Sequence, residues 1–268
     1  WLSHFLGHHA PGLRDIRATA RAMHHVLLAH GRAIEVMRGL GMDNLGAVFN
    51  FEWATPVDDT AAAQAAAETY DAIYNRFFLG GVFKGAYPEP ALKGLEPHLP
   101  KGWQEDFKTI TQPVDWCGLN YYTRKVIGAD DGPWPHYAEL DGPLPKTQMG
   151  WEIYPDGLYQ FLSRTAADYT GDLPLIVTEN GMANPDVITG GRVSDPERIA
   201  YVDAHLARVR RAIADGVPVQ GYFLWSLMDN YEWALGYEKR FGMVHVDFDT
   251  LVRTPKASYY ALKEALIR

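Results

Sequence analysis

Short apolar runs alternate with longer helical patterns along this chain, and this alternation limits its possible folds more than any other feature. A helical pattern over residues 16–40 comes first, and four apolar runs follow, each with a later helical pattern of its own. The expected strands are residues 45–50, 114–119, 173–177 and 217–225, with a further β segment over 241–247; the expected helices that follow them are residues 58–79, 156–169, 194–215 and 255–267. Such alternation predicts a parallel sheet whose strands are connected by helices.

Two architectures fit this order of elements: an open, doubly wound sheet and a closed (β/α)8 TIM barrel. A doubly wound sheet that binds dinucleotides carries a glycine-rich phosphate turn after an early strand, and a P-loop carries Gly-Lys-Ser or Gly-Lys-Thr. The sequence contains neither motif. We therefore favour the α/β barrel, and four strands are about half of the eight that close one. We predict that residues 1–268 supply roughly the C-terminal half of a single TIM-barrel catalytic domain.

Charge and apolar content argue against two classes of partner. The net charge is -8 and the pI is near 5.7, which disfavours a nucleic-acid surface. No stretch approaches the roughly 18 apolar residues of a membrane span, so no membrane insertion is expected.

Cysteine content bears on the compartment. Cys117 is the only cysteine, so no internal disulfide can form within the chain. A reducing compartment, the cytoplasm, is therefore expected. The sequence opens at Trp1 without a methionine, so an upstream signal segment stays an open alternative.

Polar and aromatic residues gather where the later strands are expected to end. One strand leads into Asn120-Tyr121-Tyr122, the next into Glu179-Asn180, and the last into residues 225–233, WSLMDNYEW. In a (β/α)8 barrel the active site lies at the carboxyl ends of the strands. Aromatic faces beside carboxylates and amides suit a sugar, because the C–H face of a pyranose packs on a ring while carboxylates accept bonds from hydroxyls.

These residues also have plainer structural interpretations. Glu179 precedes Asn180-Gly181, a strong turn signal, so a solvent-exposed turn charge is the simplest interpretation of that tripeptide. The tryptophans of the last strand end could serve only to pack the core. No metal site is expected, because His8-His9 lacks cysteine or carboxylate partners. His24-His25 and His30 lie inside a helical pattern, and their spacing is not that of a recognised metal site.

Taken together, the motifs resemble a known family. Residues 176–181, IVTENG, look like the I/V-T-E-N-G signature of the family-1 glycoside hydrolases, the retaining β-glucosidases. Further segments agree in the family's order: GLNYY at 118–122, MGWE at 149–152, YFLWSLMDNYEW at 222–233 and GYEKRFG at 236–242. Two shorter segments, HAPG at 9–12 and RTPK at 253–256, also match. The resemblance covers nearly the whole chain and implies a (β/α)8 barrel without a cofactor.

The resemblance also implies roles for individual residues. Glu179 would be the catalytic nucleophile, and Tyr122 would hydrogen-bond its carboxylate and help keep it ionised. Six further residues would contact the substrate: Asn120, Trp151, Trp225, Glu232, Trp233 and Phe241. Of these, Trp225 would be the floor under the sugar, Glu232 and Trp233 would bind its outer hydroxyls, and Trp151 would flank the leaving group.

The same resemblance implies partners for this chain. In relatives, the Asn-Glu-Pro motif with the acid/base Glu lies a few residues before the segment matched by residues 1–4. We therefore expect the acid/base outside this chain, in an N-terminal half of the barrel from the same precursor or a separate chain. Alone, the chain is expected to be inactive. The substrate would be a β-glycoside with a non-phosphorylated sugar, because the Glu232-Trp233 pair is typically lost in members that bind 6-phosphorylated sugars. A non-catalytic sugar-binding relative or a thioglucosidase is the alternative if the acid/base is not Glu.

Overall fold

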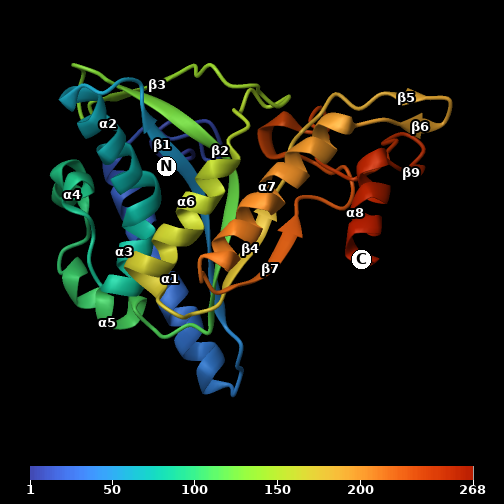
Figure 1. Cartoon of the computed structure of the whole chain (residues 1–268). Helices are drawn as coiled ribbons and strands as arrows, with labels where there is room; N and C mark the ends of the chain where they lie inside the picture. The colour runs from blue at the N-terminus through green and yellow to red at the C-terminus, as the bar shows by residue number, and fades with distance from the viewer. Residues whose placement is uncertain (268) are drawn as a thin grey trace.

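The four predicted strands form one parallel sheet in the order of the sequence (Figure 1). The computed structural model describes residues 1–267, so Arg268, the last residue of the predicted domain, lies outside the described residues. The strands are β1 (Gly46–Pro56), β2 (Trp116–Ala129), β4 (Leu175–Asn180) and β7 (Val219–Leu224). Consecutive strands are neighbours in space, with parallel pairing throughout. This order is that of successive barrel strands, whereas a doubly wound sheet reverses its strand order at a switch point.

The connecting helices form where the periodicity predicts them. The principal helices are α1 (Ile16–Gly39), α2 (Ala61–Asp71), α3 (Phe77–Lys84), α6 (Pro155–Thr165), α7 (Pro196–Ala214) and α8 (Ala257–Ile267). In α1 the side chains of Ala20, Met23, Leu27 and Ile34 are buried, which is the apolar stripe of an amphipathic helix. Asp15 caps α1 by accepting a hydrogen bond from the backbone N–H of Ala18 at 2.9 Å.

The start of the second helix differs from the prediction. The helix was expected to begin at Asp58, but α2 begins at Ala61 and its N-cap is Thr60, whose hydroxyl accepts from the N–H of Ala63 at 3.2 Å. Asp58 instead accepts hydrogen bonds from Thr60. A π-helical turn over Ala72–Arg76 then joins α2 to α3.

Several short elements lie outside the helices and strands expected from the sequence or differ from them in length. β2 continues beyond the predicted end at residue 119, because its second half pairs both with β1 and with the antiparallel strand β3 (Tyr137–Leu140). The remaining short elements are α4 (Glu89–Leu95), α5 (Phe107–Ile110), β5 (Ile188–Thr189), β6 (Arg192–Val193), β8 (Val244–Val246) and β9 (Arg253–Pro255). The β segment expected over 241–247 is thus three residues long.

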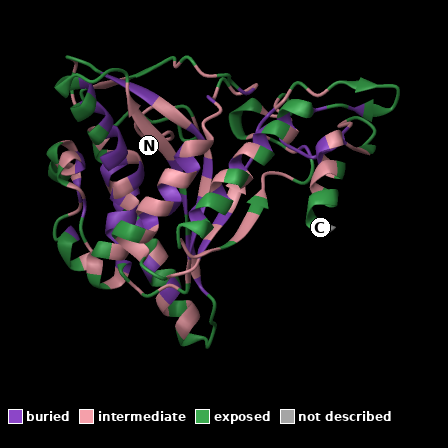
Figure 2. Ribbon diagram, viewed as in Figure 1, coloured by how far each residue is buried: buried purple, intermediate pink, exposed green. Residues whose placement is uncertain are grey.

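The helices cover one face of the sheet, and the other face is largely uncovered. On the covered face Leu119, Leu175 and Val177 are fully buried in a core shared with the helices. Figure 2 shows this core as buried residues where the helices meet the strands, while the tip of β7 is exposed. On the opposite face, Val48 is 49% exposed and Phe223 is 61% exposed. Within residues 1–267, none of the helices combines the length and apolarity needed to cross a bilayer.

Candidate active site

Glu179 and Tyr122 meet at the carboxyl edge of the sheet. Glu179 lies near the end of β4, opposite Asn120 of β2, and the pairing of these strands shifts register between Leu119 and Asn120. The Tyr122 hydroxyl donates a hydrogen bond to Oε2 of Glu179 at 2.6 Å. Two residues that lie 57 positions apart are therefore brought together by neighbouring strand ends.

Tyr122 is suited to remain a hydrogen-bond donor. Burial raises the pKa of the Tyr122 phenol far above its usual value, and the hydrogen bond to Glu179 with its negative charge raises it further. The phenol consequently keeps its proton at physiological pH. No other side-chain hydrogen bond to Glu179 is formed within residues 1–267, so its second oxygen has no protein donor there.

Asn180 anchors the strand end that presents Glu179. Its side-chain amide donates to the carbonyl of Tyr121 at 2.7 Å and to the hydroxyl of Tyr201 at 3.1 Å. Its side-chain oxygen accepts from the hydroxyl of Tyr222 at 2.7 Å. Asn180 is fully buried, so the backbone beside Glu179 is held from three neighbouring elements. From the sequence, Asn180 was predicted only as a turn residue.

The predicted Asn180-Gly181 turn is wrong. β4 continues through Asn180, and neither a turn nor a positive φ occurs at Gly181. A Cβ at Gly181 would lie 1.9 Å from the carbonyl oxygen of Trp225, and the N–H of Trp225 donates to the carbonyl of Asn180 at 2.9 Å. Glycine is required because the backbone of Trp225 passes directly against it.

An aromatic wall stands beside the carboxylate. The ring of Tyr122 lies 5.5 Å from that of Trp151 and 6.1 Å from that of Phe241, and the latter two are 6.2 Å apart. Phe241 is buried and Trp151 is half-buried. The structure therefore brings together four predicted site residues, contributed by β2, β4 and two loops.

The other four predicted residues lie around this group. Asn120 accepts a hydrogen bond from the hydroxyl of Thr178 at 2.6 Å. Trp225 follows β7 and is half-buried, and its peptide bond to Ser226 is cis. Burial raises the pKa of Glu232, and the negative charge of Glu179 raises it further, so the two carboxyls influence each other.

Trp233 lies at the rim. The residue is 73% exposed, and its ring is 5.8 Å from that of His9 in an edge-on arrangement. The segment HAPG at 9–12 is thereby brought beside the Glu232-Trp233 pair, a proximity that no local sequence pattern predicts. Among the residues described by the structure, no group of three or more His, Cys, Asp or Glu side chains is arranged to hold a metal ion.

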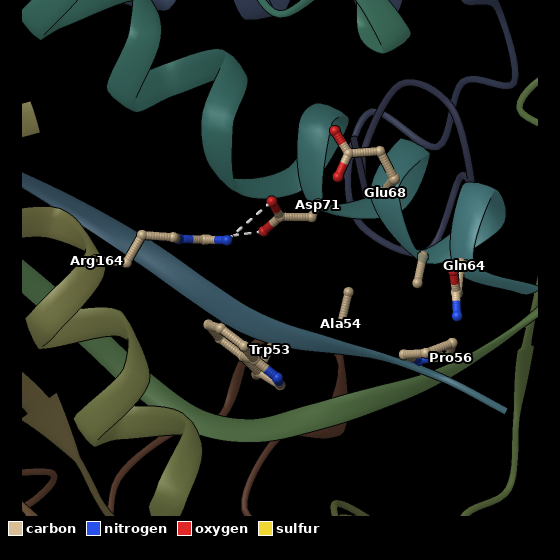
Figure 3. Close-up of a pocket in the computed structure, with 8 residues that line it drawn as sticks. Trp53, Ala54, Pro56, Gln64, Glu68, Asp71 and Arg164 are labelled. Carbon is tan, nitrogen blue, oxygen red and sulfur yellow. Dashed lines mark hydrogen bonds and ion pairs between the residues drawn. The ribbon is translucent and has the colours of Figure 1, made fainter. Parts of the chain in front are cut away.

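Two cavities lie beside the C-terminal parts of β1 and β2. One of about 300 Å³ lies along β2 and β3 and is lined in part by Trp151, so it adjoins the aromatic wall. The other, of about 210 Å³, lies between β1, α2 and α6 (Figure 3). In that cavity Trp53 faces Arg164, which pairs with Asp71 at 2.8 and 3.0 Å. No predicted site residue lines it, so it is separate from the candidate active site.

The fold and the site define the class of this protein. A parallel sheet in sequence order, with candidate site residues gathered at its carboxyl edge, is characteristic of (β/α)8-barrel proteins. Residues 1–268 match the family model described as glycosyl hydrolase family 1. The chain therefore belongs to glycosyl hydrolase family 1.

Characterised members of the family are similar over nearly the whole chain. It is 41% identical to beta-glucosidase A of Acetivibrio thermocellus over 275 residues, which is 99% of this chain and 60% of that protein. It is 42% identical to a beta-glucosidase of Agrobacterium sp. over 264 residues, 96% of this chain and 57% of that protein. A family 1 β-glucosidase structure from Thermotoga maritima superimposes with a TM-score of 0.95 at 38% identity, covering 99% of this chain and 60% of that one. The chain thus spans about 60% of the length of these relatives.

Proposed function

We propose that this chain supplies the nucleophile and part of the sugar-contacting residues of a retaining β-glucosidase. The observation that carries the proposal is the 2.6 Å hydrogen bond from Tyr122 to Glu179 at the carboxyl edge of a family 1 sheet. Relatives that bear the name β-glucosidase support the choice of substrate. The proposed substrates are non-phosphorylated β-D-glucosides and related β-glycosides.

The proposed mechanism has two displacements. Retaining glycosidases hold two carboxyl groups about 5–5.5 Å apart on opposite sides of the glycosidic bond. Glu179 attacks the anomeric carbon and forms a covalent glycosyl-enzyme, while an acid protonates the departing oxygen. The same group then takes a proton from water, which attacks the anomeric carbon and releases Glu179. We assign that acid/base to a segment outside residues 1–268.

The remaining predicted residues would hold the sugar. Trp225 would pack against the C–H face of the ring, and Asn120 and Phe241 would line the same pocket. Glu232 and Trp233 would bind the outer hydroxyls. A carboxylate at Glu232 would repel a phosphate dianion, which is the physical reason for a neutral sugar. Trp151, beside the cavity along β2 and β3, would flank the leaving group.

Replacement of the nucleophile tests the proposal. In a polypeptide that contains this chain together with the acid-bearing segment, Glu179→Gly should lower turnover of an aryl β-glucoside by about 10⁴-fold or more, as loss of a covalent nucleophile does elsewhere. Glu105→Gly is the matched control, because Glu105 is a surface carboxylate that pairs with Lys108. The 6-phosphate of the same glucoside should be a poor substrate.

Undiminished turnover in Glu179→Gly would refute the assignment of the nucleophile. A wild-type protein that binds glucosides without cleaving them would instead favour the non-catalytic alternative. Cleavage restricted to S-linked glucosides would favour a thioglucosidase.

A further inference from the structure

Six charged side chains form a cluster next to the candidate site, around the segment that follows β7. The acids are Asp186, Asp195 and Asp229, and the bases are Arg198, Arg240 and Lys256. Five of these side chains are at most 1% exposed, and only Arg240, at 22%, reaches the solvent. The formal charges balance within the cluster. Since a buried charge without a partner is strongly unfavourable, each member depends on its neighbours.

Asp229 joins two chain segments through both of its carboxylate oxygens. Oδ1 accepts from the N–H of Gly242 at 3.0 Å and from Nζ of Lys256 at 2.8 Å. Oδ2 accepts from Nη1 of Arg240 at 2.7 Å and from the N–H of Val246 at 3.3 Å. The side chain therefore ties the segment after β7 to the segment that leads into and through β8.

The segments that Asp229 joins carry the proposed sugar contacts. Backbone bonds run from the N–H of Met243 to the carbonyl of Ser226 at 2.9 Å, and from Ser226 to Phe241 at 3.3 Å. Trp225 immediately precedes this ladder, and Glu232 follows Asp229 by three residues. The positions of Trp225, Glu232 and Phe241 are consequently coupled.

Lys256 links Asp229, and with it the two segments that Asp229 joins, to the chain that follows β4, the strand that carries Glu179. Its ammonium contacts Asp186 as well as Asp229. Asp186 also accepts from Arg198 at 2.8 and 3.1 Å, and Arg198 donates to the carbonyl of Arg240 at 2.9 Å. Burial and the charge of Arg198 lower the pKa of Lys256, whereas Asp229 and Asp186 raise it, so both carboxylates favour its charged form.

We propose that Lys256, Asp229 and Arg240 are positioning residues. They fix residues 225–233, which carry Trp225, Glu232 and Trp233, relative to Glu179, and they thereby set the discrimination between different sugars in the substrate. The inference rests on the proposed function, because it concerns contacts that Glu232 and Trp233 make with outer hydroxyls. None of the three belongs to the set of predicted substrate contacts. The segment RTPK at 253–256, which matched the family without a role, acquires one through Lys256.

The test is a specificity ratio measured in the polypeptide that includes the acid-bearing segment. For each variant, kcat/KM is determined for an aryl β-glucoside and for its 6-deoxy analogue, which have the same leaving group. The ratio does not depend on the fraction of folded enzyme. Lys256→Met and Arg240→Met should lower the ratio by about tenfold, the size of effect expected when a specific polar contact is misplaced. Arg240→Lys, which keeps the charge, should restore most of it.

Arg208→Met is the matched control. Arg208 pairs with Asp156 at 2.6 Å on the outer surface, between α7 and α6. Its replacement by Met should leave the ratio unchanged. Arg240 is partly exposed, so its variants serve if Lys256→Met does not fold. An active wild type whose ratio survives in Arg240→Met overturns this inference alone. A wild type that cleaves neither glycoside overturns the proposed function and this inference with it.

Discussion

At the scale of single residues, the candidate site depends on a tyrosine that cannot ionise beside a carboxylate. Burial and the charge of Glu179 both raise the pKa of Tyr122, so the phenol donates to the carboxylate instead of competing with it for a proton. Hydrogen bonds to an ionised acceptor are about twice as strong as those between neutral groups. The O–H group of Tyr122 is thus a fixed dipole directed at the carboxylate of Glu179, the proposed nucleophile.

Removing that donor should slow catalysis. Tyr122→Phe keeps the ring against Trp151 and Phe241 but deletes the 2.6 Å hydrogen bond. A hydrogen bond to a charged group contributes about 1.5–3 kcal/mol, so kcat on an aryl β-glucoside should fall roughly 10- to 100-fold. Tyr159→Phe, which removes an exposed bond to Asp215, is the control. Equal rates for both variants would contradict a role for Tyr122 in orienting Glu179.

A second prediction concerns stability and His205 of α7. Its ring lies 4.0 Å from that of Tyr201 and donates through Nδ1 to the carbonyl of Tyr201 at 2.8 Å. Burial lowers the pKa of His205 to about 4 from the ordinary 6.5. At pH values between about 4 and 6.5, His205 binds a proton in the unfolded chain but stays neutral in the folded chain. The free energy of unfolding should therefore decrease as pH falls through this window, by roughly 3 kcal/mol in total.

Chemical denaturation of wild type and His205→Leu between pH 7 and pH 4 measures this effect. The variant should be less stable at pH 7 but should show a flatter pH dependence. Other buried groups titrate equally in both proteins, so the difference between the two curves isolates His205. Parallel curves would show that His205 accepts a proton without disturbing the fold.

At the scale of elements, strand interiors followed from the sequence while strand ends did not. β2 was expected to stop at residue 119, yet its polar continuation pairs with β1 as far as Ile127 and with β3. Those pairs join residues distant in sequence, and apolar periodicity does not report them. Gly181 shows the same limit, because a glycine is required there by the backbone of Trp225, which follows β7, and not by a local turn.

Adding one methyl group at Gly181 tests that explanation. In Gly181→Ala the new Cβ would meet the Trp225 carbonyl at 1.9 Å, so β4 and β7 must separate locally. The variant should lose about 1–3 kcal/mol of stability, the usual cost of overpacking. Gly39→Ala, at the open end of α1, has nothing within 4 Å of its Cβ and should be neutral or stabilising. Thermal unfolding of both variants gives the comparison, and an unperturbed Gly181→Ala would argue for space at this contact.

At the scale of the whole molecule, the uncovered face of the sheet is the dominant feature. Val48 and Phe223 on this face are 49% and 61% exposed. Exposed apolar and aromatic residues continue through the segment after β7: Leu227, Met228, Tyr231, Trp233, Leu235 and Tyr237. In a closed barrel the inward-facing side chains of opposite strands fill the interior. An uncovered face of this kind favours association with other surfaces.

Residues 1–268 produced alone should therefore self-associate and lack activity. Size-exclusion chromatography with light scattering should show oligomers, and Phe223→Ser should shift the distribution toward monomer. Ile213→Ser is the control, because Ile213 is comparably exposed but lies on α7. A monomeric chain that cleaves an aryl β-glucoside by itself would contradict both the expected inactivity and the assignment of the acid/base to another segment.

The sequence by itself determined the alternation of strands and helices, the parallel barrel class, the family and the set of candidate residues. These follow from side-chain periodicity and from local motifs, which residues near each other in the chain encode. Only the tertiary structure decided that Asn180 is a buried anchor and that Lys256 pairs with Asp229 next to the site. Those facts depend on register between strands and on charges paired inside the fold, both of which arise from contacts between distant segments.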